Sequence, residues 1–306
     1  MKLSEHIESK KLLSFFFLAY LFCSNVNAYS PKLESISATV LHLSSDSVLK
    51  DLDSNPILTF APNVSSGIGF SLEFKKITLG YVFTSHQETA EGFKASQFND
   101  FRLNFAIGSF DIRLNYQRYK GAIVDANNLK FFYSDYEVKA KNIRVHYYFD
   151  KNHLKYIREG KSLTTLAYET STSLSMGTWL VGINIDKREI KLPSLLESQH
   201  QSLVNQKSID YKTNFNALTI GPIAGYDYYY FFHSLFLRAK AAIGPGFQFD
   251  GGITPQYELA LTFGAAFNQN NSLMISIDSY LMNFKKDNKN LENNNIQGGI
   301  IYTLTL

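Results

Sequence analysis

The residues best spaced for covalent chemistry are a histidine and a serine two positions apart, His42 and Ser44. Residues i and i+2 of a strand point to the same side, so the imidazole could take the serine proton and activate the hydroxyl towards an ester. Both lie on the same side as Ile36, Ala38 and Val40. This spacing predicts a lipid hydrolase as one alternative. No partner asparagine can be named, and among 7 histidines the spacing also arises by chance.

A larger set of ionisable residues recurs at every second position. In FRLNFAIGSFDIRLNYQRYKG, residues 101–121, Phe, Leu and Ile alternate with Arg, Asn and Asp. The same alternation along the chain predicts a polar face that carries Glu73, Asp100, Arg102, Asp111, Arg113, Arg144, His146, Asp186, Arg238, Lys240, Glu258 and Asp278. The two signs nearly cancel. The set therefore predicts a polar network or a weakly selective channel, not a porin constriction with a field of one sign.

Metal and cofactor chemistry is not indicated. No second histidine or cysteine stands at metal-ligand spacing from His146, which is better read as a hydrogen-bonding partner. Glycine-rich phosphate loops are absent from the sequence. We therefore expect no metal and no cofactor.

The elements that must position these residues are strands. Period-two alternation recurs from residue 33 to the end, with hardly a helical period. The predicted strands are 33–43, 56–75, 76–85, 98–107, 110–119, 129–138, 141–149, 162–172, 177–188, 213–230, 233–249, 254–268, 272–284 and 295–306. That makes about fourteen, and twelve if the weakest two, 129–138 and 162–172, are not strands. Tight links alternate with longer polar connections such as 189–212, which could also form a short helix at the mouth. The two-residue link at Gly108-Ser109 predicts a hairpin in which Phe105 lies opposite Ile112.

Alternation alone fits two folds: a soluble periplasmic β-sandwich with the apolar face inside, or a transmembrane barrel with that face outside. The polar face is rich in Asn, Gln, Thr, Ser and Gly, which suits a hydrogen-bonded lumen, and the apolar rows contain few charges. Short turns on one rim and long loops on the other are typical of outer-membrane barrels. The sequence therefore predicts an all-β, closed antiparallel barrel with short periplasmic turns and longer extracellular loops, and the sandwich remains the alternative.

The N-terminus indicates export. Lys10 and Lys11 precede an apolar run, residues 12–23, and a small-residue site that ends at Ala28. Residues 1–28 are therefore predicted to be a cleaved signal peptide, and residues 29–306 the barrel. The single cysteine, Cys23, would leave with the signal peptide. With 30 basic and 27 acidic residues, the chain shows no preference for nucleic acid.

The last ten residues, QGGIIYTLTL from Gln297 to Leu306, form an alternating strand that resembles the signal read by the outer-membrane barrel assembly machinery. The terminal Leu306 stands where phenylalanine is usual. We expect the assembly machinery and outer-membrane lipid as partners, and a location in the outer membrane of a Gram-negative bacterium.

Several stretches resemble a family of bacterial outer-membrane proteins known as domain of unknown function family 4421. They are YQRYKG at 116–121, NVSSGIGFSLEFKKITLGYVF at 63–83, NIRVHYYF at 142–149, TSLSMGTWLVG at 172–182 and LTIGPIAGYDYYYF at 218–231. The resemblance implies the barrel and the outer-membrane location, and it implies no activity. We therefore expect a non-enzymatic barrel, either a narrow passive pore or an envelope-structural or binding protein.

Overall fold

The computed structural model describes residues 33–51, 57–61, 67–74, 77–84, 96–126, 129–150, 153, 163–191, 215–249, 252–286 and 289–306. The predicted signal peptide, residues 1–28, and most of the predicted loop 189–212 lie outside the described residues. No helix in the described part is long and apolar enough to cross a membrane.

The described part consists of antiparallel strands and one short helix, α3 (Leu163–Glu169). The strands are β1 (Leu33–Asp51), β2 (Ile57–Ala61), β3 (Gly67–Phe74), β4 (Ile77–Phe83), β5 (Gln97–Ile107), β6 (Phe110–Ala126), β7 (Leu129–Tyr148), β8 (Ser173–Lys191), β9 (Phe215–Phe232), β10 (Leu235–Gln248), β11 (Gly252–Ala266), β12 (Asn271–Lys286) and β13 (Lys289–Thr305).

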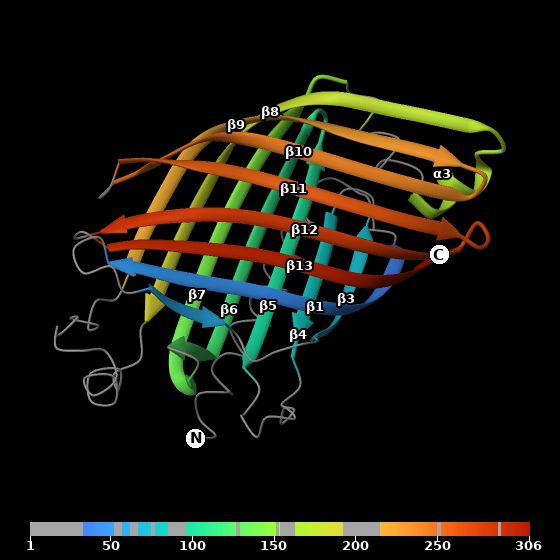
Figure 1. Cartoon of the computed structure of the whole chain (residues 1–306). Helices are drawn as coiled ribbons and strands as arrows, with labels where there is room; N and C mark the ends of the chain where they lie inside the picture. The colour runs from blue at the N-terminus through green and yellow to red at the C-terminus, as the bar shows by residue number, and fades with distance from the viewer. Residues whose placement is uncertain are drawn as a thin grey trace, which may run out of the picture. The chain divides into compact units, whose positions relative to one another are not determined.

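The strands close into one barrel (Figure 1). β13 pairs with β1 from Ser35↔Thr305 to Asp51↔Lys289, so the last strand meets the first along nearly its whole length. Twelve strands form the wall, and the short β2 pairs with β1 and β6 as an extra strand. Closure leaves no free sheet edge around the wall. The alternative of a β-sandwich is wrong, because the described strands belong to one closed sheet and not to two packed layers.

The wall has twelve strands and not fourteen for two reasons. Segments 129–138 and 141–149 form the single strand β7, because its ladder with β6 and β8 continues through Lys139 and Lys141. The predicted strand 162–172 contains α3 instead. A smaller difference is that the predicted strand 56–75 is two strands, β2 and β3.

Long and short connections occur at both rims: at the rim opposite the start of β1, the connections 84–96 and 192–214 are long, whereas 127–128, 249–251 and 287–288 are short. We call the rim where β1 begins and β13 ends the α3 rim, and the opposite one the far rim. The two-residue turn at Gly108-Ser109 lies at the α3 rim, and the register predicted for it is confirmed, with Phe105 opposite Ile112. His233 and Ser234, with φ of 45° and 69°, form another tight turn there. The connection 149–172 between β7 and β8 is a long exception at this rim.

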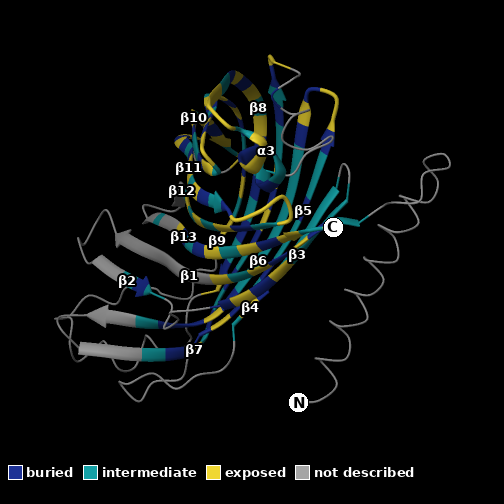
Figure 2. Cartoon of the chain, turned by 90° about the vertical axis from the view of Figure 1, so that its right-hand side faces the viewer, coloured by how far each residue is buried: buried dark blue, intermediate teal, exposed yellow. Residues whose placement is uncertain are grey.

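Exposed and buried residues alternate along the strands (Figure 2). On β8, Trp179 and Ile183 are 66% and 51% exposed, whereas Asn184 and Asp186 are buried. The exposed residues are mostly large and apolar, and many of the buried ones are polar or charged. Leu103 departs from its row, since it is only 3% exposed although it was expected on the outer face. The wall therefore has the polarity opposite to that of a soluble protein.

The strands β9 and β10 approach each other closely where both contain a proline. The ladder is interrupted between Ile243↔Ala224 and Phe247↔Ile220, a stretch that contains Pro222 and Pro245. Proline has no N–H to donate to a ladder. A Cβ on Gly221 would lie 1.9 Å from the Pro245 carbonyl oxygen, so glycine is required for the close approach.

Candidate functional site in the barrel interior

The centre of the interior is a cluster of charges around Glu258 of β11. Its Oε1 accepts a hydrogen bond from Lys240 Nζ at 2.9 Å and lies 3.3 Å from Arg144 Nη1 and 3.6 Å from Arg113 Nη1. Lys240 Nζ is also 3.2 Å from His146 Nδ1. These residues come from β6, β7, β10 and β11, and β11 is not a neighbour of β6 or β7 in the sheet. The contacts therefore run across the lumen.

Glu258, Lys240 and His146 are almost fully buried, at 4%, 2% and 0% exposure. Burying a charge is costly unless it is paired and hydrogen-bonded. One carboxylate here faces three cations, and Asp111 supplies a second one, because Arg113 Nε donates to its Oδ2 at 2.7 Å. The cluster is thus close to charge balance, and it ties opposite parts of the wall together.

A second cluster surrounds Asp227 of β9, near the α3 rim. Arg238 donates two hydrogen bonds to its carboxylate, at 3.1 and 2.9 Å, and the Tyr148 hydroxyl donates at 3.3 Å. His153, from the β7–β8 connection, is 1% exposed and has its Nε2 3.8 Å from Asp227 Oδ2. Its ring stacks on Tyr148 and meets Tyr229 edge-on. The connection is therefore anchored inside the barrel.

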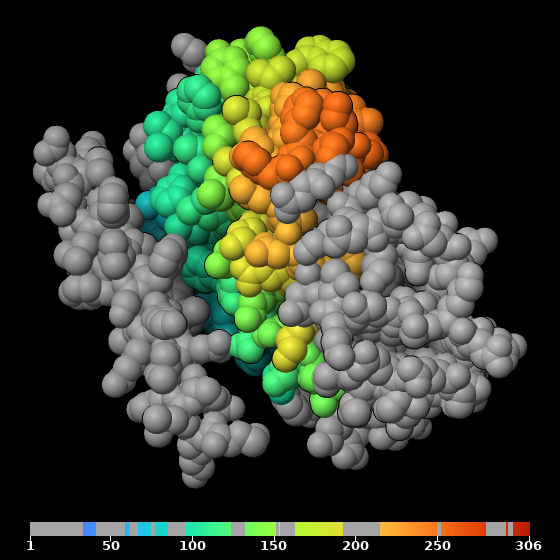
Figure 3. Space-filling model, turned by 90° about the vertical axis from the view of Figure 1, so that its left-hand side faces the viewer, coloured from blue at the N-terminus to red at the C-terminus, as the bar shows by residue number. Residues whose placement is uncertain are grey.

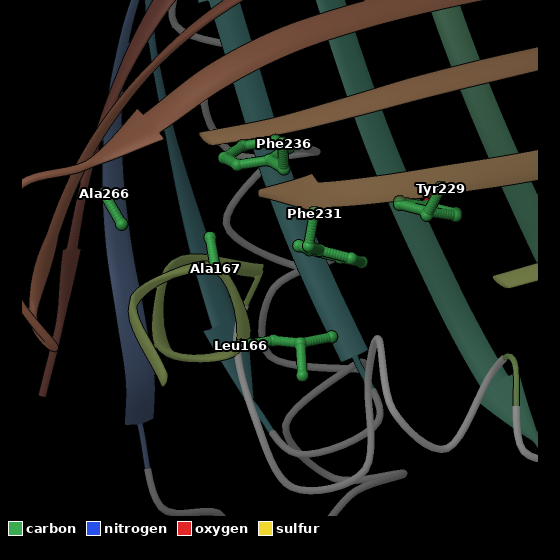
Figure 4. Close-up of a cluster of buried hydrophobic side chains, with 6 residues drawn as sticks. All are labelled: Leu166, Ala167, Tyr229, Phe231, Phe236 and Ala266. Carbon is green, nitrogen blue, oxygen red and sulfur yellow. The ribbon is translucent and has the colours of Figure 1, made fainter. Parts of the chain in front are cut away.

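The helix α3 belongs to the same connection and packs against the inner wall (Figure 4). Leu166 and Ala167 form a buried cluster with the residues Tyr229, Phe231, Phe236 and Ala266. The Thr164 and Ser272 hydroxyls are hydrogen-bonded at 2.6 Å. These wall residues alternate with exposed ones such as Phe232 and Phe267, so they face inwards. α3 therefore lies in the mouth of the barrel at the α3 rim.

Two further pairs of an acidic and a basic side chain line the wall. Asp100 accepts hydrogen bonds from Arg102 Nε at 2.8 Å and from Gln117 Nε2 at 3.3 Å, and Arg102 also donates to Gln297 of β13. Asp186 accepts from Arg188 Nε at 3.0 Å and from Asn142 Nδ2 at 3.2 Å. The hydrogen bond from β5 to β13 joins strands that are not neighbours, so it also crosses the interior.

These groups surround a cavity of about 120 Å³. It is lined by Arg102, Asn104, Arg113, Asn115, Gln117, Ala140, Asn142, Arg144, Asp186, Arg188, Glu258, Leu259, Asp278, Ser279 and Gln297. The volume holds a few water molecules, and ligand pockets are commonly about 300–1,000 Å³. The cavity is therefore suited to water or a small polar solute.

The structure brings half of the twelve sequence-predicted site residues together in one cluster. Six belong to the Glu258 cluster: Asp111, Arg113, Arg144, His146, Lys240 and Glu258. Arg238 lies apart from them, with Asp227. Asp100 and Arg102 form a pair, and Asp186 pairs with Arg188. Glu73 accepts a hydrogen bond from Ser35 at 2.8 Å, and Asp278 lines the cavity.

Sequence reasoning missed Asp227, Arg188 and His153. The alternation along a strand could have revealed the first two. Arg188 lies two positions after Asp186 and so shares its face, and Asp227 lies one position from the exposed Tyr226 and so points the opposite way. His153 lies in a connection between strands, where side chains do not alternate between two faces, so nothing in the sequence indicated its burial.

The hydrolase candidates lie on β1, whose backbone pairs His42 with Gly298 and Ser44 with Ile296. The side chains of His42 and Ser44 lie outside the described residues. No group of three His, Cys, Asp or Glu residues that could hold a metal ion occurs in the described part of the chain. The interior clusters contain paired acids and bases around a small cavity, so the arrangement can bind polar solutes and brace the wall.

The closed wall, the apolar exterior and the charged interior define an up-and-down β-barrel protein. The chain belongs to the family described as "Domain of unknown function (DUF4421)", whose family model matches residues 32–305. No curated protein matches the chain.

Solved structures of similar fold include the outer membrane protease OmpT from Escherichia coli, with 10% identity, 92% of this chain and 99% of that chain covered, and a TM-score of 0.40. The translocator domain of the autotransporter NalP from Neisseria meningitidis has 9% identity, 96% and 97% coverage and a TM-score of 0.36. Neisserial surface protein A has 8% identity, 89% and 97% coverage and a TM-score of 0.27.

Proposed function

We propose that this chain is a non-enzymatic barrel of the Gram-negative outer membrane whose interior is braced and closed, so that it serves as an envelope-structural or small-solute-binding protein. The observation that carries the proposal is the inverted polarity of the wall. Trp179, Ile243 and Ile253 are 66–69% exposed on the outside, while Asp111, Lys240 and Glu258 are buried inside.

A lipid environment accounts for this polarity. Exposed apolar patches on soluble monomers are rarely larger than a few hundred Å², whereas here apolar rows cover strand after strand. A bilayer also demands that every backbone group be paired, which closure of β13 on β1 provides. The strands, for example 20 residues in β7, exceed the roughly 9–11 that a membrane requires, so part of the wall would project beyond it.

Two features support a closed interior over a passive pore. The Glu258 cluster spans the lumen with ion pairs between β11 and the opposite strands β6 and β7. At the α3 rim, α3 packs against Phe231 and Phe236 inside the mouth. An ion would have to displace both the charged cluster and the helix, which leaves little room for steady flow.

Planar-bilayer recording tests the closed interior. Purified protein is first shown to be folded, by migration on a cold detergent gel that changes on boiling, and is then added to the bilayer. We expect no stable current steps from the wild-type protein. Regular steps of uniform size from folded protein would mean that the lumen is an open pore. Fractionation of cells tests the location, with recovery in the outer membrane expected.

We also propose that the terminal strand, from Gln297 to Leu306, is recognised by the outer-membrane barrel assembly machinery. The support is that β13 pairs on both sides, with β12 and β1, and so completes the barrel. Tyr302→Ser with Leu304→Ser should abolish assembly in cells but permit refolding of purified protein into detergent. Normal assembly of this variant in cells would count against the proposal.

A further inference from the structure

The outer face of β6, β7 and β8 changes abruptly from apolar to basic towards the far rim. In order along the wall, successive cross-strand rows on these three strands are Leu114–Ile143–Ile185, Tyr116–Lys141–Lys187, Arg118–Lys139–Glu189 and Lys120–Glu137–Lys191. We call Arg118, Lys120, Lys139, Lys141, Lys187 and Lys191 the basic patch. The change from the first row to the second takes two residues along each strand.

The basic side chains outnumber the acidic ones that face the same way. Glu137 Oε1 is 2.6 Å from Arg118 Nε, and its Oε2 is 3.4 Å from Lys139 Nζ. Glu189 Oε1 lies 3.0 Å from Lys187 Nζ. Among the described residues, no carboxylate is paired with the other three lysines of the patch, Lys120, Lys141 and Lys191. The patch thus has an excess of positive charge.

The register places like charges directly opposite one another. Lys141 of β7 faces Lys187 of β8, and Arg118 of β6 faces Lys139 of β7. Opposed residues of an antiparallel pair have Cβ atoms about 4.5–5.5 Å apart, and like charges in that position are destabilising. Glu137 already bridges Arg118 and Lys139. Among the residues that the structure describes, Lys141 and Lys187 share only the contact of Lys187 with Glu189, so theirs is the pair that a bound anion would stabilise.

Among the described side chains, the basic patch does not continue onto β9, β10 and β11. On β9, β10 and β11 the outer face remains apolar towards the far rim, where Leu218, Phe247 and Ile253 are 36%, 49% and 69% exposed. In Figure 3 the green to yellow-green residues of β6–β8 form one continuous face, and β9 separates it from the orange residues of β10 and β11. A general preference for charge at the rim would not produce this asymmetry.

We propose that the basic patch binds the phosphate groups of a phosphorylated glycolipid in the outer leaflet, with its acyl chains against the apolar rows below. This inference rests on the proposed membrane location, in which the far rim faces outwards. The row of Leu114, Ile143 and Ile185 would then lie in hydrocarbon, and Lys141 and Lys187 at the level of the headgroups. A lipid fits better than a free anion, because the apolar and basic surfaces are continuous along the same three strands.

The test uses the full-length folded protein in neutral detergent micelles and native mass spectrometry with added diphosphoryl lipid A. The double variant Lys141→Gln with Lys187→Gln removes one opposed pair, and Lys141→Arg with Lys187→Arg is the matched control that keeps the charge. We expect the Gln variant to bind about 30-fold more weakly, because each surface lysine contributes about fivefold to affinity for anionic headgroups. The Arg variant should bind as the wild type does, and added salt should weaken binding.

The comparison lipids separate the possible outcomes. Equal binding of lipid A with and without its phosphates, or unchanged binding by the Gln variant, would overturn the inference and leave the barrel intact. Binding of inorganic phosphate alone as tightly as the lipid would replace the lipid with a soluble anion and also overturn it. A chain that stays soluble without detergent and has no heat-modifiable form would overturn the proposed function together with this inference.

Discussion

Glu258→Gln should strongly destabilise the folded barrel. The substitution keeps the shape of the side chain but removes the negative charge that faces Lys240, Arg144 and Arg113. Asp111 remains within 2.7 Å of Arg113, so one of the three cations keeps a carboxylate partner. Lys240 and Arg144 lose the ion pair that offsets their burial.

The magnitude follows from burial. Glu258 is 4% and Lys240 2% exposed, so water can screen little of the unbalanced charge. Removing one partner of a buried ion pair typically costs about 3–5 kcal/mol. The glutamine can still accept a hydrogen bond from Lys240, which places the expected loss in the free energy of unfolding at about 3 kcal/mol. Adding Lys240→Met should restore part of that loss, because it removes one of the uncompensated cations.

The assay is urea unfolding of the barrel in lipid vesicles, followed by the fluorescence of Trp179, the single tryptophan of the chain, which lies on the outer face. The matched control is Glu189→Gln, which breaks the exposed ion pair with Lys187 and should cost at most about 1 kcal/mol. Equal, small losses for both variants would refute the reasoning, because they would mean that the Glu258 cluster is solvated like the outer surface.

Three further predictions concern the helix, the outer face and the close strand approach. Leu166→Asp places a charge against the aromatic residues that hold α3, so we expect the unfolding free energy in vesicles to fall by at least about 2 kcal/mol, whereas Tyr168→Asp on the exposed side of α3 should change it little. The Glu258 cluster still spans the lumen, so neither variant should give current steps. Leu261 is 48% exposed on the outer face, and Leu261→Arg should lower the unfolding free energy in vesicles by about 2–4 kcal/mol at mid-membrane depth. No change in the unfolding free energy in vesicles would argue against lipid contact. Gly221→Ala should prevent refolding, while Gly298→Ala, whose Cβ would come no nearer than 3.9 Å to Ser276 O, should refold normally; comparable refolding yields would contradict the assigned clash.

The all-β fold and the division of the wall into two faces could be predicted from the sequence. Both depend on the period of two, which every strand displays locally: Phe105 opposite Ile112 followed from the turn at Gly108-Ser109 alone. The strand count could not be predicted as securely. Lys139 and Lys141 resembled a turn because they are charged, and only pairing with β6 and β8 shows that they continue a strand.

The tertiary structure alone decided which interior residues meet. The alternation of side chains along a strand predicts that Arg144 and Glu258 face the lumen. It does not predict their height or their position around the barrel, which depend on strand number, tilt and stagger. The segment 163–169 mixes Thr164, Thr165 and Tyr168 with the helix formers Leu163, Leu166, Ala167 and Glu169. It was expected to be a strand, yet it forms α3, packed against Phe231 and Phe236 of strands distant in sequence. Local pattern determined which side chains face the lumen, whereas closure of the barrel determined their partners and placed a helix in the mouth.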